Sequence, residues 1–332
     1  MSDVREPGSV PEVSGHPTSD PGHRSSLVPV SLPDIYAARE RIAPYVHRTP
    51  LLPMSVGLYL KCENLQVTGA FKARGAFNHV LAHRAECERG IVTASSGNHG
   101  NAVAYVAKTL GLRAVVVVPE DVVAAKADAI MDSGAELIRF GRYSEERVPH
   151  AKELSERRGL HYVPPYDDPL IIAGQGTAGL ELVEQFPHVE TVAVPVSGGG
   201  LISGIAIAVK ELRPQAKVIG VEPEGARRFA QSRTAGRLVV LEKAETIADG
   251  LRVLTPGALT WEVTSRYVDE FVGISDRQIE TAMRRILLDA HVLAEPSGAI
   301  AAAWALSAPQ PACVAVLSGG NASPDLLRRL LA

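Results

Sequence analysis

Residues 64–75 read Asn-Leu-Gln-Val-Thr-Gly-Ala-Phe-Lys-Ala-Arg-Gly and follow the apolar segment Leu58–Cys62. This order predicts a strand, a short turn that bears glycine, and a helix over 70–85. Lys72 lies near the start of that helix. A lysine in a partly apolar setting loses its proton readily, and its neutral amine attacks carbonyl groups to form Schiff bases. Taken alone, Lys72 is better explained as a solvated surface charge. A catalytic role for it depends on whether other parts of the chain supply the rest of a site.

A second apolar segment, 191–196, ends in Ser197 and three consecutive glycines before an apolar helical stretch. The backbone N–H groups of Gly198, Gly199 and Gly200 can converge on an anion at the helix start, where the helix dipole favours negative charge. The loop lacks the Gly-Lys-Ser/Thr ending of a P-loop, so it suits a phosphate ester better than a nucleoside triphosphate. The alternative is a turn that binds nothing, but three glycines cost backbone entropy and favour a function.

A third loop, 91–101, again joins an apolar strand to a helix and reads Ile-Val-Thr-Ala-Ser-Ser-Gly-Asn-His-Gly-Asn. Hydroxyl, amide and backbone N–H groups gather at this helix start, which predicts a cradle for a substrate carboxylate. An ordinary N-cap is the alternative. One cap does not need Ser95, Ser96, Asn98 and His99 together.

Seven motifs follow one another between Leu58 and Asn321. They are Thr-Gly-Ala-Phe-Lys-Ala-Arg-Gly at 68–75, Ser-Ser-Gly-Asn-His-Gly at 95–100, Ile-Ala-Gly-Gln-Gly-Thr at 172–177, Ser-Gly-Gly-Gly-Leu at 197–201, Thr-Ile-Ala-Asp-Gly at 246–250, Glu-Pro-Ser-Gly at 295–298 and Leu-Ser-Gly-Gly-Asn at 317–321. In this order the motifs make the chain resemble the fold-type II pyridoxal-phosphate enzymes, in the group of serine racemase and the serine/threonine dehydratases. The resemblance implies an α/β fold like that of the tryptophan synthase β subunit, with pyridoxal 5'-phosphate in a cleft between two three-layer, parallel-sheet domains.

Strand and helix patterns alternate along the chain, which independently indicates parallel sheets covered on both faces. Strands are expected at Leu58–Cys62, 90–94, 113–119, 136–140, 191–196, 217–221 and Cys313–Leu317, and helices at 70–85, 101–110, Ser144–Arg158, 168–185, 201–212, Asp276–Asp289 and 298–307. By resemblance, a small domain at 90–162 is inserted into a large domain formed by 31–89 and 163–332. Residues 1–30, rich in Pro, Gly and Ser, are expected to be a disordered tail.

The resemblance also implies a role for each matching residue. Lys72 would form the Schiff base with the cofactor and then take the α-proton of the substrate. Phe71 would pack against the cofactor ring, Asn98 would hydrogen-bond its hydroxyl, and Ser318 would face its pyridine nitrogen. The cofactor phosphate would be held by Ser197, Gly198, Gly199, Gly200 and Leu201. The substrate would be bound by Ser95, Ser96, Gly97, Asn98 and His99.

Two serines bear on the type of reaction. A hydroxyl at Ser318 does not stabilise a pyridinium as a carboxylate does, and this weaker electron sink suits rapid loss of a β-hydroxyl group. Ser96 matches the second proton-transfer residue of the racemases, on the face of the cofactor opposite Lys72. Elimination is served from the lysine face alone, whereas racemisation needs a group on both faces. The alternatives are therefore a serine/threonine dehydratase and an amino-acid racemase; a binding protein without turnover is a third, although the catalytic residues are all present.

Some positions depart from the racemase pattern. Glu222 and Ala226 match two ligands of the racemases' divalent cation, but Arg228 stands where a second carboxylate is expected, so we expect no metal. Val67 replaces a lysine that helps to bind activating nucleotide, and Tyr166 replaces an asparagine near the cofactor. These departures favour the dehydratase, which would release a 2-oxo acid and ammonia from L-serine, L-threonine or a related β-hydroxy amino acid. Arg147 either reaches the distal carboxylate of 3-hydroxyaspartate or pairs with charges on an exposed helix, and we favour the exposed helix.

The composition excludes several classes of function. The chain has 332 residues, enough for two domains, and a formal net charge of −3 without basic clusters, so neither nucleic acid nor an anionic membrane surface is expected as a partner. No apolar run reaches the roughly 18 residues of a membrane span. The expected partners are a small amino-acid substrate and, by resemblance, a second copy in a homodimer.

Other motifs point to no further chemistry. Cys62, Cys87 and Cys313 are too scattered for a zinc site, and an odd number without a secretory signal indicates reduced thiols in the cytoplasm. No histidine pair is expected to have metal-ligand spacing. The glycines at 174–179 match the dinucleotide pattern, but they lie in a predicted helix and no acidic residue ends a following strand at the usual distance. We interpret them as sites of close helix packing.

Overall fold

The computed structural model describes residues 29–95, 97–122, 124–142 and 144–331. Residues 1–28, most of the tail that the sequence predicts to be disordered, lie outside the described residues. Val30 is 1% exposed and belongs to a core cluster with Ile35 and Ile172. The expected end of the tail at residue 30 is therefore wrong, because an apolar side chain is already buried there.

The chain alternates between strands and helices over most of its length. The strands are β1 (Leu51–Ser55), β2 (Leu58–Cys62), β3 (Ile91–Ala94), β4 (Ala114–Val118), β5 (Glu136–Arg139), β6 (His161–Tyr162), β7 (Thr191–Pro195), β8 (Lys217–Pro223), β9 (Glu270–Ile274) and β10 (Cys313–Leu317). The α-helices are α1 (Leu32–Ile42), α2 (Lys72–Ala82), α3 (Asn98–Leu110), α4 (Ala124–Met131), α5 (Ser144–Arg158), α6 (Pro169–Gln185), α7 (Gly200–Leu212), α8 (Arg228–Ala235), α9 (Ala258–Tyr267), α10 (Asp276–Asp289), α11 (Pro296–Ser307) and α12 (Pro324–Leu331). Every strand and helix predicted from the sequence forms, with ends shifted by a few residues.

A six-stranded sheet has the order β1-β2-β10-β7-β8-β9. Its strands pair in parallel except at one edge, where β1 runs antiparallel to β2. The predicted parallel sheet carries this additional antiparallel edge strand because Val56 and Gly57 join β1 to β2 in a short hairpin, in which Gly57 has a φ of +76°. A parallel pair would need a long crossover connection, whereas an antiparallel pair closes through a turn of this length.

The six-stranded sheet is covered on both faces. Alternate residues of β10 point to opposite sides: Ala315 and Leu317 join the core cluster that contains residues of α10 and α11, and Val314 and Val316 join the cluster that contains residues of α7. This alternation follows from the two-residue period of a strand. Because both sides are buried, β7 and β10 read as continuous apolar runs, as expected of parallel strands.

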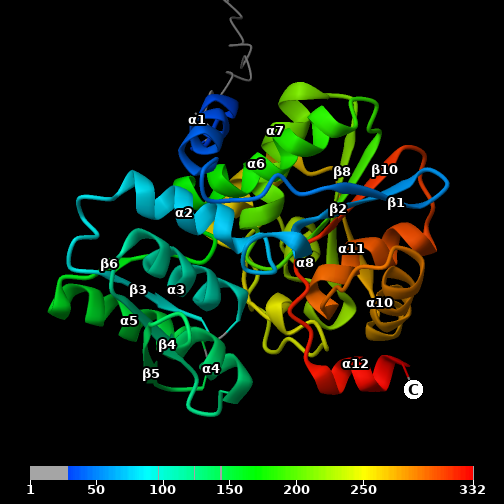
Figure 1. Ribbon diagram of the computed structural model, residues 1–332. Coiled ribbons are helices and arrows are strands. Elements are labelled where there is room, and N and C mark those ends of the chain that lie inside the picture. The colour runs from blue at the N-terminus through cyan, green and yellow to red at the C-terminus, as the bar shows by residue number, and fades with distance from the viewer. Residues whose placement is uncertain (1–28, 96, 123, 143, 332) are drawn as a thin grey trace, which may run out of the picture.

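A second, wholly parallel sheet has four strands in the order β5-β4-β3-β6. Figure 1 shows it at the lower left, apart from the six-stranded sheet, with α3, α4 and α5 beside it. All four strands fall within residues 90–162, the range that the sequence analysis assigns to a small domain. The division into two domains with those boundaries stays a prediction.

Glycines of α6 allow its neighbours to approach closely. A Cβ atom added to Gly174 would lie 2.7 Å from the Arg74 carbonyl oxygen of α2, and one added to Gly176 would lie 2.9 Å from the Gly204 carbonyl oxygen of α7. Both distances are too short for a real side chain. The glycines at 174–179 therefore serve helix packing, as the sequence predicts, and α6 holds α2 and α7 in place.

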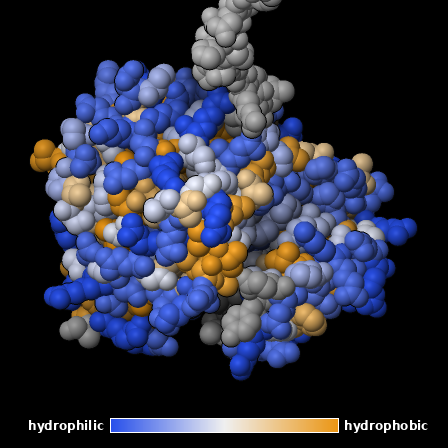
Figure 2. All heavy atoms as spheres, turned by 180° about the vertical axis from the view of Figure 1, so that it is seen from behind, coloured by the Kyte–Doolittle hydropathy of each residue, from blue (hydrophilic) through white to orange (hydrophobic). Residues whose placement is uncertain are grey.

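The face of the molecule drawn in Figure 2 is largely hydrophilic. Figure 2 shows hydrophobic side chains scattered over one face, with one gathering near its centre beside a hollow. Among the described residues, no helix combines the length and the apolar character that crossing a membrane requires.

A buried ionic network fixes the start of α2. The Arg74 guanidinium donates hydrogen bonds to both carboxylate oxygens of Glu63 at 2.7 and 2.8 Å and to both oxygens of Glu181 at 2.7 and 2.9 Å. Lys61 Nζ adds a bond of 2.6 Å to Glu181. Burial alone would raise the pKa of Glu63, but the charge of Arg74 lowers it overall. The network thus joins β2 and the adjoining Glu63 to α2 and α6. Its central residue, Arg74, lies two residues after Lys72 in α2.

Replacing Arg74 by Met is expected to lower the free energy of unfolding by about 3–5 kcal/mol, because it leaves two buried carboxylates without their main partner. Urea unfolding followed by circular dichroism measures this difference. Arg84→Met is the matched control: Arg84 is exposed just beyond the same helix, and its replacement is expected to change stability by less than about 0.5 kcal/mol. Equal stability of the two variants would contradict the role given to Arg74.

Candidate active site

Lys72 opens α2 in a setting that favours its neutral form. Its Nζ donates a hydrogen bond of 2.6 Å to the Pro165 carbonyl oxygen and lies 5.1 Å from the centroid of the Phe71 ring. Burial lowers the pKa of Lys72 to about 8. About a tenth of the amine is therefore unprotonated at pH 7, far more than in an ordinary lysine, and the neutral amine is the form that attacks a carbonyl group.

The lowered pKa predicts how the protein without cofactor reacts with pyridoxal phosphate. Lowering the pKa moves the rise in neutral amine to lower pH, so the association rate should increase about tenfold per pH unit below pH 8 and level off above about pH 9. Stopped-flow absorbance measures this rate. Free Nα-acetyl-lysine, measured in parallel, corrects for ionisation of the aldehyde itself. A rate that keeps rising to pH 10, as the free amine's does, would show that Lys72 is not perturbed.

Backbone hydrogen bonds bring Ser318 beside this lysine. The Phe71 N–H donates to the Ser318 carbonyl oxygen at 3.1 Å, and Ala70 and Gly319 form an isolated antiparallel bridge. The Ser318 hydroxyl is buried and donates to the Ser297 carbonyl oxygen at 3.3 Å. Since Ser318 directly follows β10, the end of that strand lies against the turn that carries Lys72.

The start of α3 meets the same region. Asn98 Nδ2 donates to Glu295 Oε1 at 2.5 Å, and Asn321 Nδ2 donates to Asn98 Oδ1 at 2.8 Å. The predicted carboxylate loop therefore adjoins the segment after β10. Glu295 is a site residue that was not predicted from the sequence, although its place in the Glu-Pro-Ser-Gly motif at 295–298 was the available signal.

The remaining residues of the carboxylate loop are placed differently. Ser95 Oγ accepts a hydrogen bond of 3.3 Å from the Gly97 N–H, and Ser96 lies outside the described residues. His99 is buried, and its Nε2 lies 3.2 Å from the Val163 carbonyl oxygen. Burial and the nearby Lys72 charge lower the pKa of His99 to about 3. His99 is thus a neutral ring that ties α3 to residue 163.

The glycine loop, residues 197–201, borders the region around Lys72. It joins β7 to α7, and Gly199 has a φ of +98°, a conformation that favours glycine. A Cβ atom on Gly198 would lie 2.4 Å from the Tyr166 ring. The Ser197 hydroxyl is buried and has no hydrogen-bond partner among the described residues. An unpartnered hydroxyl at the start of a 13-residue helix fits a phosphate group.

Residues 165 and 166 connect the lysine to the glycine loop. Pro165 accepts the Lys72 hydrogen bond, and the next residue, Tyr166, packs against Gly198. Thr260 Oγ1 holds the loop from the other side through a bond of 2.7 Å to the Gly198 carbonyl oxygen. Lys72, Ser318, Asn98 and the glycine loop are thus linked through short contacts, although they come from distant parts of the chain.

A buried guanidinium lies under the glycine loop. Arg228 donates to four main-chain carbonyl oxygens, those of Val196 at 3.2 Å, Ser197 at 3.1 Å, Ala226 at 2.5 Å and Leu251 at 2.6 Å. Glu222 beside it accepts from the N–H groups of Phe229 and Ala230, both at 2.9 Å, and burial raises its pKa despite the Arg228 charge. The guanidinium therefore puts a positive charge against Ala226, a position that the sequence resemblance had matched to a cation ligand.

Arg147 differs from its sequence-based interpretation. It is 8% exposed, and its guanidinium donates to the Arg142 carbonyl oxygen at 2.6 Å and to Ser144 Oγ at 3.3 Å. The expectation that Arg147 is an exposed residue is therefore wrong, because its side chain is buried. Sequence pattern alone does not reveal this burial, because it depends on how the side chain packs in the folded protein, where it contacts Arg142 and Ser144.

The chain is similar to known proteins in both sequence and structure. Residues 42–319 match the family described as "Pyridoxal-phosphate dependent enzyme". The chain is 40% identical to the L-threonine ammonia-lyase of Thermotoga maritima over 91% of this chain and 78% of that protein. It is 44% identical to the serine racemase of Oryza sativa subsp. indica over 82% of this chain and 84% of that protein. The solved structure of maize serine racemase is similar with a TM-score of 0.87 and 38% identity, over 91% of this chain and 97% of that one.

Proposed function

The chain belongs to the fold-type II pyridoxal-phosphate-dependent enzymes, in the group of serine/threonine dehydratases and serine racemases, and from that membership we propose that it is a dehydratase. Its substrate would be L-serine, L-threonine or a related β-hydroxy amino acid, and its products a 2-oxo acid and ammonia. The observation that supports this most is the convergence of Ser318 and the glycine loop on Lys72.

The residues present fit the cofactor. Lys72 offers a neutral amine, and the glycine loop offers backbone N–H groups together with the unpartnered Ser197 hydroxyl. When bound, pyridoxal phosphate supplies an aldehyde for amines and a conjugated ring that withdraws electrons from the substrate's Cα. Lys72 would hold the cofactor, and Ser197 with Gly198 to Leu201 would hold its phosphate.

The protein's own residues then account for the proton transfer. Lys72 Nζ, with a pKa of about 8, is matched to accept a proton near neutral pH and to return it afterwards. Ser318 presents a hydroxyl, not a carboxylate, at the end of β10, and so adds no negative charge to stabilise a positive ring nitrogen. Ser95, Gly97 and the start of α3 would orient the substrate carboxylate.

Racemisation is the second candidate function. The pair Ser95-Ser96 and the 44% identity to a serine racemase favour it. Replacing Ser96 by Ala would then abolish inversion of L-serine, measured by chiral chromatography, while elimination continues. Unchanged inversion in that variant would remove Ser96 from the mechanism.

A substrate screen tests the dehydratase. The purified protein, saturated with pyridoxal phosphate, is incubated separately with L-serine, L-threonine, 3-hydroxyaspartate and phenylserine, and 2-oxo acid formation is followed. The proposal expects turnover of L-serine or L-threonine. Product from 3-hydroxyaspartate alone would instead favour a hydroxyaspartate dehydratase, and no product from any of them, in a protein that shows the cofactor's absorbance, would contradict the proposed function.

A further inference from the structure

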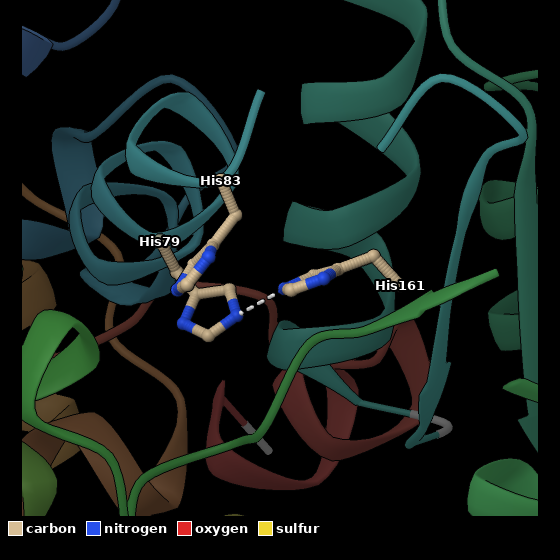
Figure 3. A group of neighbouring side chains, drawn as sticks. All are labelled: His79, His83 and His161. Atoms are coloured by element: carbon tan, nitrogen blue, oxygen red, sulfur yellow. Dashed lines mark hydrogen bonds between the residues drawn. The ribbon is translucent and has the colours of Figure 1, made fainter. Parts of the chain in front are cut away.

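Three histidines meet at the far end of α2 from Lys72. His79 lies in the last turn of the helix, His83 follows its end, and His161 comes from β6 (Figure 3). One ring nitrogen from each lies within 4.8 Å of the others. The expectation that no histidine pair has metal-ligand spacing is wrong, because His79 and His83 are four residues apart and share one face of the helix.

Carboxylates hold the Nδ1 atom of each ring. His79 Nδ1 lies 3.0 Å from Asp168 Oδ1, and His83 Nδ1 lies 2.9 Å from Glu86 Oε1. His161 Nδ1 lies 3.3 Å from the other oxygen, Glu86 Oε2. A histidine that donates its Nδ1–H to a carboxylate presents an unprotonated Nε2, the atom through which imidazole binds a metal ion.

The Nε2 atoms of two of these rings face each other. His79 Nε2 and His161 Nε2 lie 2.9 Å apart and share a hydrogen bond, and Figure 3 shows the rings turned toward each other. Two imidazole nitrogens that meet in this way can bind one metal ion in place of the proton between them.

We propose that His79, His83 and His161 bind one Zn²⁺ ion through their Nε2 atoms, with a fourth position open to water. Imidazole suits zinc, and metal-binding histidines commonly donate their other N–H to a carboxylate. Two nitrogens bound to tetrahedral zinc lie about 3.4 Å apart. The His79–His161 pair, at 2.9 Å, would have to open by about half an ångström, and a pair at the 4.8 Å limit of the group would have to close by about 1.4 Å.

The surroundings suit a cation that arrives from solvent. The side chains of His79, His161 and His83 are 5%, 15% and 31% exposed, so the site opens gradually on the His83 side. His79 and His83 lie at the C-terminal end of α2, where the helix dipole favours positive charge. Lys72 begins the helix seven residues earlier, about 10 Å away along its axis, so this site is separate from the proposed catalytic one.

Zinc binding tests the proposal on protein without a histidine tag, after dialysis against a chelator. Titration calorimetry with Zn²⁺ is expected to show one equivalent bound, and Co²⁺ is expected to give the visible absorbance of a tetrahedral site. His83→Ala and His161→Ala should each lose at least about tenfold in affinity. Asp168→Asn, which can still cap α6 through its side-chain oxygen, should lose about 10–100-fold.

His188→Ala is the matched control, because His188 is exposed and distant in sequence from the cluster, and it should bind zinc as the wild type does. Pyridoxal phosphate absorbance shows that each variant is folded, independently of any catalytic activity. Zinc affinity that is unchanged in folded His83→Ala and His161→Ala, or wild-type protein that binds no zinc, would overturn the proposal.

Discussion

Lys72→Ala is expected to lower the rate of 2-oxo acid formation by at least about 10⁴-fold. General acid–base catalysis by a positioned group contributes about 10²–10⁴-fold, and the variant also loses the amine that would hold the cofactor covalently. The protein should still fold, because Lys72 forms its hydrogen bond to a backbone carbonyl at the start of a helix and takes no part in the buried ionic network. Continuous assay of 2-oxo acid from L-serine or L-threonine measures the loss.

Lys108→Ala provides the matched control for this loss. Lys108 is exposed on α3, and its Nζ makes only a long hydrogen bond of 3.4 Å to a backbone oxygen. Its replacement should leave the rate within about twofold, since it touches nothing in the site. Activity of Lys72→Ala within tenfold of the wild type, with the cofactor bound, would exclude Lys72 from catalysis.

Arg228→Met is expected to have the second large effect. It would remove four hydrogen bonds to carbonyl oxygens and leave the buried Glu222 without its neighbouring positive charge. Breaking such a buried charged arrangement costs about 3–5 kcal/mol. Because Val196 and Ser197 lead into the glycine loop, the loss should also weaken pyridoxal phosphate binding, by at least about tenfold.

Urea unfolding and an absorbance titration with pyridoxal phosphate measure the two effects of Arg228→Met. The exposed neighbour Arg227 supplies the control variant, Arg227→Met, which should match the wild type closely in both. In the same account the wild-type rate is independent of chelators, because the guanidinium supplies the positive charge. Activity that falls on chelation and returns with Mg²⁺ would show that Arg228 does not replace a cation.

The sequence predicted the central strands and many of the helices around them, because buried parallel strands such as β7 and β10 are apolar runs followed by glycine-rich loops. It missed the strands β1, β6 and β9 and the helices α1, α4, α8 and α9. β6 has two residues and no pattern of its own. β9 is only partly buried at the sheet edge, and β1 depends on the hairpin at Gly57, so pairing and not local pattern decides these strands.

The parts of the candidate site that lie within one sequence motif were predictable from the sequence. The resemblance of the motif series to the fold-type II pyridoxal-phosphate enzymes implied that Lys72, Asn98, the glycine loop and Ser318 meet at one site. Contacts between distant segments were not: the four carbonyl bonds of Arg228 and the pairing of Arg74 with Glu181 depend on how the helices pack. The His161 ring joins His79 and His83 only because β6 returns beside β3.

The attachment point of the cofactor tests the central claim most directly. The protein saturated with pyridoxal phosphate is reduced with borohydride, which fixes a Schiff base as a stable amine, then digested and analysed by mass spectrometry. The account predicts the added phosphopyridoxyl mass on the peptide that contains Lys72, and its absence from that peptide in Lys72→Ala. The same mass on another lysine of the wild-type protein, with none on Lys72, would contradict it.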